Sequence, residues 1–331
     1  MQKDRNRAWT ASARQDHYQE VTDKIIAALE SGVVPWRKGW DASQCGGPFN
    51  AVTRHAYRGI NRLLLDLMQM RRNACDPRWC SYRQAQVQGW QVRRGETGTR
   101  IYFYRRIERA RRAWDGEDSA FAPEDRKIIP VLRAYVIFHA SQIDGIADYV
   151  PPGPDHLPWQ RPEAVQAILD ASGIEIRMGG NEACYLPHED VILLPPAHAF
   201  ESAESWAVTA IHELSHASGA RHRLNRELNT RFGSAAYAAE EVLVEWASCM
   251  VCSTLGLAVD YTNNASYIDT WLGTWLGVMR ADKRAIFRIA TEAQRVADYI
   301  LGLHPDFAAI ERGAALDGEQ ADDDAPSAEA A

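Results

Sequence analysis

The chain has 331 residues, of which 46% are hydrophobic, enough for two domains with buried cores. It begins with a charged stretch and holds no apolar segment near the length of a membrane span, so we expect a non-secreted, cytoplasmic protein with no membrane partner. Its six cysteines are scattered along the chain, which favours a reducing compartment over a disulfide framework.

Charge is divided unevenly along the chain. Residues 1–113 carry 22 Lys and Arg against 10 Asp and Glu, a net charge of +12, whereas the remainder carries 15 against 34, a net charge of −19. Only the N-terminal part is therefore suited to a polyanionic partner.

The hydrophobic pattern of the N-terminal part predicts an α+β domain over residues 1–148. Helical periodicity is followed by alternating, β-rich segments. The predicted elements are helices over 17–30, 59–70 and 81–88, a strand, turn and strand over 90–94, 95–98 and 99–105, and a strand over 131–138. Residues 113–127 are polar, with turn-forming breaks, and predict an excursion between strands.

Residues 149–162 contain five prolines and no periodicity, which is typical of an interdomain linker. Beyond it we predict a mostly helical domain over residues 163–304 with a small β-sheet. Its predicted elements are a helix over 163–171, strands over 174–178, 184–186 and 191–194, and helices over 206–219, 237–255, 266–279 and 282–301. The acidic, Ala-rich tail over 317–331 is predicted to be disordered, because it has too little apolar bulk to bury.

A His-Glu-x-x-His motif, His212 to His216, lies within one of these predicted helices. Residues four apart share a helix face, so both imidazoles can bind one ion. The predicted ion is Zn²⁺, with Mn²⁺ as an alternative. Glu213 is the predicted catalytic base, because it can accept a proton from water that the metal has acidified.

A second helix offers the third ligand. Glu241 and Glu245 are four residues apart on a face that continues through Ser248 and looks buried, where carboxylates need partners. We assign Glu241 as the ligand and Glu245 as its supporting carboxylate, with the reverse order open. Glu240 projects differently and is predicted to be an exposed charge.

His222 is a rival third ligand, because the motif continues to it with the spacing of metzincins. A metzincin also requires a methionine-containing turn beneath the metal. The downstream candidates, Met250 and Met279, both fall in helical patterns, so we prefer Glu241.

The basic part interleaves Arg with aromatic residues, a combination suited to single-stranded nucleic acid. Unpaired bases stack on aromatic rings, and Arg neutralises phosphates. No zinc finger or helix-turn-helix pattern points to duplex DNA. About half of these aromatic residues are expected to belong to the core instead.

The whole chain also resembles the ArdC-type antirestriction proteins of conjugative plasmids and other mobile elements. The N-terminal marks are residues 34–36, 48–50, 57–61, 79–85, 89–96 and 140–145, and the C-terminal marks are 212–219, 223–224, 240–245 and 265–268. The chain departs from the family pattern at Ala217 and Ala220, where the family usually has a bulky aromatic residue and a histidine. The departure leaves His212, Glu213 and His216 intact.

The resemblance implies a single-stranded-DNA-binding domain followed by a zincin-like metallopeptidase domain, acting to protect incoming DNA from host restriction. A host restriction component is the candidate protein target. The alternative is a DNA-binding shield whose metal site is structural or vestigial. The candidate DNA-contacting residues are Trp36, Arg37, Lys38, Asn50, Tyr57, Arg58, Asn61, Trp79, Tyr82, Arg83, Trp90, Arg93, Arg94 and Arg105.

Overall fold

A computed structural model describes residues 16–35, 47–72, 75–110, 126–150, 162–228, 234–257 and 265–305, together with Phe307. The predicted residues Trp36, Arg37 and Lys38, most of the linker and the acidic tail lie outside this part. In the N-terminal part the elements are α1 (His17–Glu30), β1 (Phe49–Asn50), α2 (Gly59–Arg72), β2 (Arg78–Cys80), α3 (Tyr82–Val87), β3 (Gln91–Val92), β4 (Thr99–Ala110), β5 (Arg126–His139) and β6 (Ile143–Asp144).

The C-terminal part is mostly helical, with one small sheet, as the sequence predicts. Its elements are α4 (Pro162–Ser172), β7 (Glu175–Met178), β8 (Cys184–Leu186), β9 (Val191–Leu194), α5 (Ala203–Ala217), α6 (Ala235–Thr254), α7 (Ala265–Ala281) and α8 (Ala285–Leu301). The sheet has the order β7-β9-β8, with β7 parallel and β8 antiparallel to β9.

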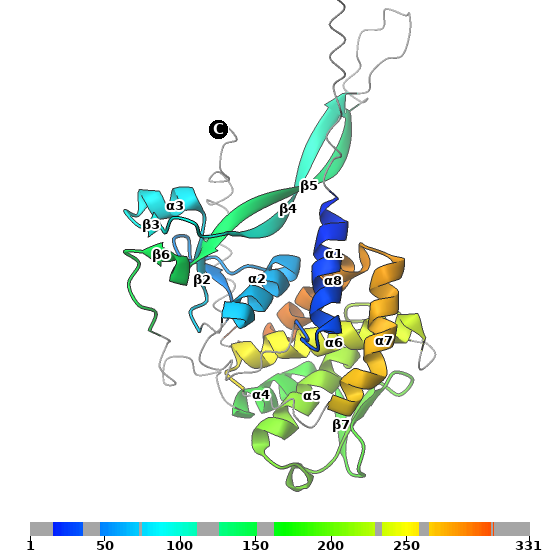
Figure 1. The fold of residues 1–331 in the computed structure, drawn as a ribbon. Coiled ribbons are helices and arrows are strands. Elements are labelled where there is room, and N and C mark those ends of the chain that lie inside the picture. The colour runs from blue at the N-terminus through cyan, green and yellow to red at the C-terminus, as the bar shows by residue number, and fades with distance from the viewer. Residues whose placement is uncertain are drawn as a thin grey trace, which may run out of the picture.

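The N-terminal sheet has the order β1-β2-β5-β4. Its longest part is the antiparallel pair of β4 and β5, which runs from Thr99 opposite Ile137 to Ala110 opposite Arg126. This ribbon extends away from the helices in Figure 1. The strands are longer than predicted, so residues 126 and 127 belong to β5 and not to the polar excursion.

The predicted pairing of residues 90–94 with 99–105 is wrong. β3 pairs with β6 in a separate two-stranded sheet. The segment 95–98 therefore links two different sheets. It is held there by the side chain of Gln142, which donates to Glu96 at 2.9 Å and to the carbonyl of Thr97 at 3.0 Å.

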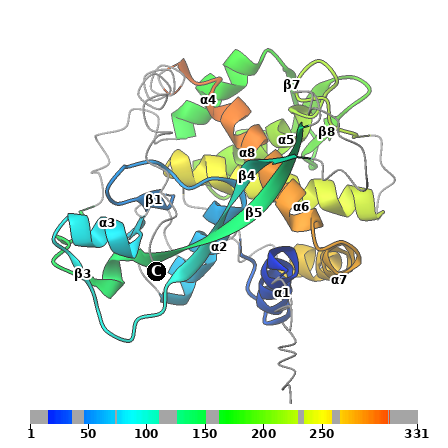
Figure 2. The same cartoon turned by 90° about the horizontal axis from the view of Figure 1, so that it is seen from above.

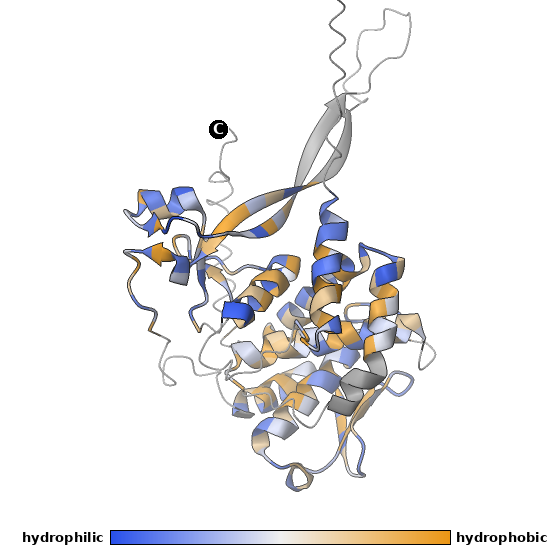
Figure 3. Ribbon diagram, in the orientation of Figure 1, coloured by the Kyte–Doolittle hydropathy of each residue, from blue (hydrophilic) through white to orange (hydrophobic). Residues whose placement is uncertain are grey.

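One hydrophobic core joins the two parts of the chain. Val21 and Ile25 of α1 and Leu63 of α2 belong to the same buried cluster as Trp246 of α6 and Ile286 of α8. Figures 1 and 2 both show α1 alongside α7, and Figure 3 shows hydrophobic residues gathered where the helices face one another. The predicted domains are thus packed into one body.

Cys75 is disulfide-bonded, whereas the scattered cysteines predict a reducing compartment. Four others are free, namely Cys80, Cys184, Cys249 and Cys252.

Candidate metal centre and nucleic-acid interface

Helix α5 presents the two motif histidines to α6. Its N-terminus is capped by Ser202, whose hydroxyl accepts a hydrogen bond from the backbone N–H of Ser205 at 3.0 Å. Ala210 and Leu214 are fully buried and fix the helix against the core. One turn apart, His212 and His216 lie with ring centroids 5.0 Å from each other.

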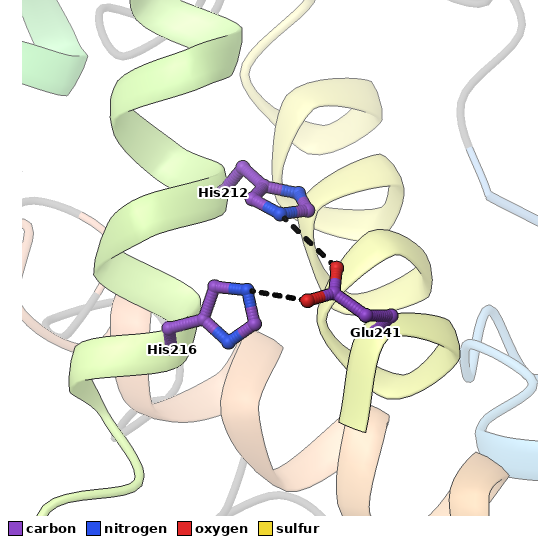
Figure 4. Close-up of side chains that lie close together, drawn as sticks. All are labelled: His212, His216 and Glu241. Carbon is purple, nitrogen blue, oxygen red and sulfur yellow. Dashed lines mark ion pairs between the residues drawn. The ribbon is translucent and has the colours of Figure 1, made fainter. Parts of the chain in front are cut away.

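Glu241 of α6 faces both imidazoles. Its two carboxylate oxygens lie 3.8 Å from Nε2 of His212 and 3.7 Å from Nε2 of His216 (Figure 4). One donor atom from each of the three residues lies within 4.8 Å of the others. Glu241 is only 3% exposed, so its negative charge is held away from water.

The other imidazole nitrogens each face a second carboxylate. Nδ1 of His212 is 3.7 Å from Glu245, and Nδ1 of His216 is 3.6 Å from Glu240. Both rings therefore have Nε2 toward Glu241 and Nδ1 away from it. The prediction that Glu240 is an exposed charge is wrong, because its side chain is 11% exposed and pairs with Arg226 at 2.8 Å.

Charge and burial oppose each other at His216 and Glu240. Burial acts to lower the pKa of His216, but the carboxylates of Glu240, Glu241 and Glu213 outweigh it, so the pKa is raised. Burial acts to raise the pKa of Glu240, but its contacts with His216 and Arg226 outweigh it, so the pKa is lowered. The carboxylates around His216 thus favour positive charge at this position.

Two further side chains line the centre. Glu213 is 7% exposed and close enough to influence the pKa of both His216 and Tyr237. Burial and a hydrogen bond to Glu241 raise the pKa of Tyr237, whose hydroxyl is thus a donor at neutral pH. Tyr237 and Arg226 carry no metal-ligand spacing in the sequence, which is why sequence reasoning missed them.

The donor set suits a divalent ion such as Zn²⁺ or Mn²⁺. Two imidazole nitrogens and one carboxylate oxygen are ligands for both, and three protein ligands leave a position open. Four carboxylates surround the two imidazoles, and Arg226 pairs with one of them. A cation held by His212, His216 and Glu241 would offset part of the remaining negative charge.

His222 lies apart from this centre. Its side chain is 64% exposed, and Nε2 lies 3.5 Å from Asp190 and 2.8 Å from a guanidinium nitrogen of Arg223. It is not among the residues whose donor atoms converge. The geometry therefore favours Glu241 over His222 as the third ligand.

Two predicted DNA-contacting residues belong to the interior. Asn61 is 5% exposed, and its amide both donates to and accepts from the backbone of Tyr102, at 2.8 and 2.7 Å. Trp79 is fully buried and packs edge-on against His139, with ring centroids 4.8 Å apart. Neither reaches the surface, so their assignment to DNA contact is corrected to a structural role.

Asn50 and Tyr57 are largely engaged within the fold. The Asn50 side chain accepts from the backbone N–H groups of Val52 and Thr53, at 2.9 and 3.0 Å, and donates to the Tyr57 hydroxyl at 3.1 Å. Burial raises the pKa of Tyr57 to about 12. Both residues therefore organise the turn after β1.

The predicted DNA-contacting arginines differ in whether acidic side chains of the protein already pair with them. Arg58 pairs with Asp298 of α8, and Arg93 with Asp144 and Glu96, at 3.2 and 3.1 Å. Arg83 and Arg94 are exposed, and within the described part of the chain neither makes an ion pair. Arg105 lies in β4.

Of the predicted aromatic residues in the described part of the chain, Tyr82 and Trp90 reach the surface at least in part. Tyr82, at the start of α3, is 44% exposed, whereas Trp90 is half-buried against a small cluster that includes Val92. Phe103 of β4, which sequence reasoning did not select, is 48% exposed and lies edge-on to Tyr135 of β5 at 5.7 Å. Its position in an alternating strand is the signal that could have identified it.

No helix in the described part of the chain combines the length and the apolar character that crossing a membrane requires.

Known proteins resemble both parts of the chain. Residues 15–138 match the N-terminal domain of the anti-restriction factor ArdC, and residues 163–292 match a zincin-like metallopeptidase family. Uncharacterized protein y4eC of Sinorhizobium fredii is 39% identical over 290 residues, covering 86% of this chain and 91% of that protein. DNA primase TraC of Escherichia coli is 35% identical over 302 residues, covering 88% of this chain but only 27% of the primase.

Solved structures agree with the sequence matches. The antirestriction protein ArdC from plasmid R388 superposes in its metal-free crystal structure with a TM-score of 0.72 at 36% identity, covering 88% of this chain and 99% of that one. Its Mn(II)-bound structure gives a TM-score of 0.71 at 35% identity, covering 88% of this chain and all of that one. With both parts matched in order, this chain belongs to the ArdC-type antirestriction family and carries its zincin-like domain.

Proposed function

We propose that this protein binds single-stranded DNA entering the cell and protects it from host restriction, using a metal-dependent hydrolytic centre against a protein target. The observation that carries the proposal is the convergence of His212, His216 and Glu241 beside Glu213, in a chain whose first 113 residues have a net charge of +12. The proposed place of action is the cytoplasm, where restriction enzymes meet incoming DNA.

Each residue of the proposed centre has a distinct task. His212, His216 and Glu241 hold the ion, which when bound supplies Lewis acidity and lowers the pKa of water. Glu213 accepts the proton of the attacking water and can return it to the leaving amine. Tyr237, hydrogen-bonded to Glu241, holds that carboxylate in place.

The proposed DNA surface is the exposed subset of the predicted residues. Tyr82 offers a ring on which a base can stack, and Arg83 and Arg94 offer guanidinium groups to phosphates. Contacts to phosphates fix position without reading sequence, so we expect little sequence preference. Mn(II) in the R388 protein supports a divalent ion here, with Zn²⁺ as our proposed choice.

A DNA-binding shield without hydrolysis is the second candidate, because the same surface would serve it. Hydrolytic protection requires Glu213 as a catalytic base, whereas a shield does not. Plasmid transfer into restricting and non-restricting recipients can be compared for the wild-type protein, Glu213→Gln, and the double variant of Arg83→Ala and Arg94→Ala.

Hydrolytic protection predicts that Glu213→Gln loses protection while keeping DNA affinity and bound metal. A shield predicts wild-type protection by Glu213→Gln and loss only in the double variant. Full protection by the double variant, once its weaker DNA binding has been verified, would contradict both candidates.

A further inference from the structure

In the loop after α5, the side chain of Arg226 folds back and binds the C-terminal end of that helix. Within residues 218–228, backbone N–H groups of Leu224 and Arg226 donate to the carbonyls of Ser218 and Gly219, both at 2.9 Å. The Arg226 guanidinium then donates to the carbonyl of Ser215 at 2.7 Å and to the Ser218 hydroxyl at 2.8 Å. Its side chain is 7% exposed, so this is a buried anchor.

Gly219 makes room for the guanidinium. A Cβ at this position would lie 2.8 Å from a methyl carbon of Leu228 and 3.0 Å from the central guanidinium carbon of Arg226. A side chain at residue 219 would therefore displace Arg226 or Leu228. The glycine that follows the His-Glu-x-x-His motif thus has a packing reason in this loop.

Arg226 also bridges to α6 through Glu240. Two of its guanidinium nitrogens lie 2.8 and 3.2 Å from the two Glu240 oxygens, a two-point contact that fixes the plane of the carboxylate. One of those oxygens lies 3.6 Å from Nδ1 of His216, whose Nε2 faces Glu241. Arg226, Glu240 and His216 thus form a chain ending at the proposed metal ligand.

We propose that Arg226 and Glu240 are positioning residues for His216, an inference that rests on the proposed metal centre. The guanidinium holds the carboxylate 3.6 Å from Nδ1 of His216, where its negative charge favours a proton on that nitrogen. That arrangement selects the tautomer whose Nε2 lone pair is free to bind the ion. Neither residue touches the ion or the substrate.

A purely electrostatic role and a positioning role for Arg226 predict opposite changes in cation affinity when the residue is replaced by Met. Arg226→Met removes a buried positive charge near the centre, so electrostatics alone would strengthen cation binding. Positioning predicts weaker binding, because Glu240 is no longer held against His216. The direction of the change in Zn²⁺ affinity therefore distinguishes the two explanations.

The test measures Zn²⁺ affinity of the full-length protein by competition with a chromophoric chelator. We expect Arg226→Met and Glu240→Gln each to weaken binding by about 10- to 100-fold, the range for partners of metal ligands. The double variant should resemble Glu240→Gln alone, because Arg226 acts through Glu240. Arg226→Lys, which keeps the charge but loses the two-point contact, should fall between wild type and Arg226→Met.

Arg223→Met is the matched control. Arg223 lies in the same loop, is 8% exposed, and donates to the carbonyl of Ala217 at 2.8 Å, but it pairs with Asp190 instead of a residue of the centre. It should keep wild-type Zn²⁺ affinity. Circular dichroism and thermal unfolding restrict the comparison to folded variants.

A spectroscopic measurement tests the tautomer directly. Nitrogen chemical shifts of the His216 ring, recorded in metal-free protein labelled at histidine and at a pH high enough for the ring to be neutral, should report Nδ1–H in wild type and a mixture of tautomers in Glu240→Gln. Unchanged or tighter Zn²⁺ binding by Arg226→Met, or an unchanged His216 tautomer in Glu240→Gln, would overturn the positioning role. Absence of Zn²⁺ binding by wild type would instead refute the metal centre itself.

Discussion

Replacing Glu241 by Ala provides the sharpest test of the proposed ligand set. The carboxylate is 3% exposed and is the group on α6 that faces Nε2 of both His212 and His216. Loss of an outer partner of a ligand typically costs about 10- to 100-fold in affinity. Loss of a ligand should cost more, so we expect Glu241→Ala to weaken Zn²⁺ binding by over about 100-fold, or about 2.8 kcal/mol.

His222→Ala is the comparison that separates the two possible ligand sets. Because this side chain is 64% exposed and lies against Asp190, its removal should leave Zn²⁺ affinity unchanged. Glu245→Ala should show an intermediate loss, since Glu245 faces Nδ1 of His212 and not the converging donors. Glu213→Ala should retain the metal, because a general base does not coordinate the ion.

Zinc content and chelator competition on folded variants provide the assay. Loss of Zn²⁺ in His222→Ala with retention in Glu241→Ala would refute the reasoning and establish a metzincin-like ligand set. Equal loss in Glu241→Ala and Glu245→Ala would show that both carboxylates bind the ion.

Three further predictions concern the N-terminal part. The double variant Arg83→Ala and Arg94→Ala should bind single-stranded DNA more weakly, with unchanged sequence preference. Its affinity should also depend less on salt, by about one released ion for each lost phosphate contact. Fluorescence anisotropy at several salt concentrations measures affinity and its salt dependence, and an unchanged salt dependence would exclude these contacts. Trp79→Ala should reduce the free energy of unfolding by about 3–5 kcal/mol in urea titrations, because it empties a fully buried site, and a loss near zero would show that the site is not packed. Burial lowers the pKa of His139, so the unfolded chain takes up a proton that the folded protein excludes, and stability should decline as the pH falls below about 6.5. His139→Gln should flatten that decline, whereas an unaltered pH profile would assign it to other groups.

The sequence predicted the helices well because their signals are local. α1 was predicted with its observed bounds, and α5 and α6 within three residues at each end, since apolar periodicity marks them. The same periodicity identified Glu241, whose spacing from Glu245 requires a shared helix face. Glu240 was misread because its neighbour Arg226 lies 14 residues away in a loop without periodicity.

Local sequence patterns did not predict which strands pair, or which aromatic residues are buried, in the N-terminal part. Residues 95–98 have the composition of a hairpin turn, yet β3 pairs with β6. The backbone N–H of Arg93, at the end of β3, donates to the carbonyl of Gln142 next to β6. Trp79 and Tyr82 look alike as aromatic residues near arginines, but one is fully buried and the other is 44% exposed. Which aromatic residues face solvent depends on contacts far apart in the chain.

Helices α1 and α2 of the N-terminal part share a hydrophobic core with the helices that carry the metal centre, so both sites are best studied in the full chain. The hydroxyl of Thr22 in α1 donates to the carbonyl of Lys283 at 2.8 Å, and the N–H of Gly59 at the start of α2 donates to Gln294 of α8 at 3.1 Å. α8 also packs against α6, which carries Glu241. A fragment ending before residue 150 would expose the apolar sides of α1 and α2, so its failure to bind DNA would report unfolding. Point variants in the full chain, compared at equal stability, are therefore the informative perturbation for both sites.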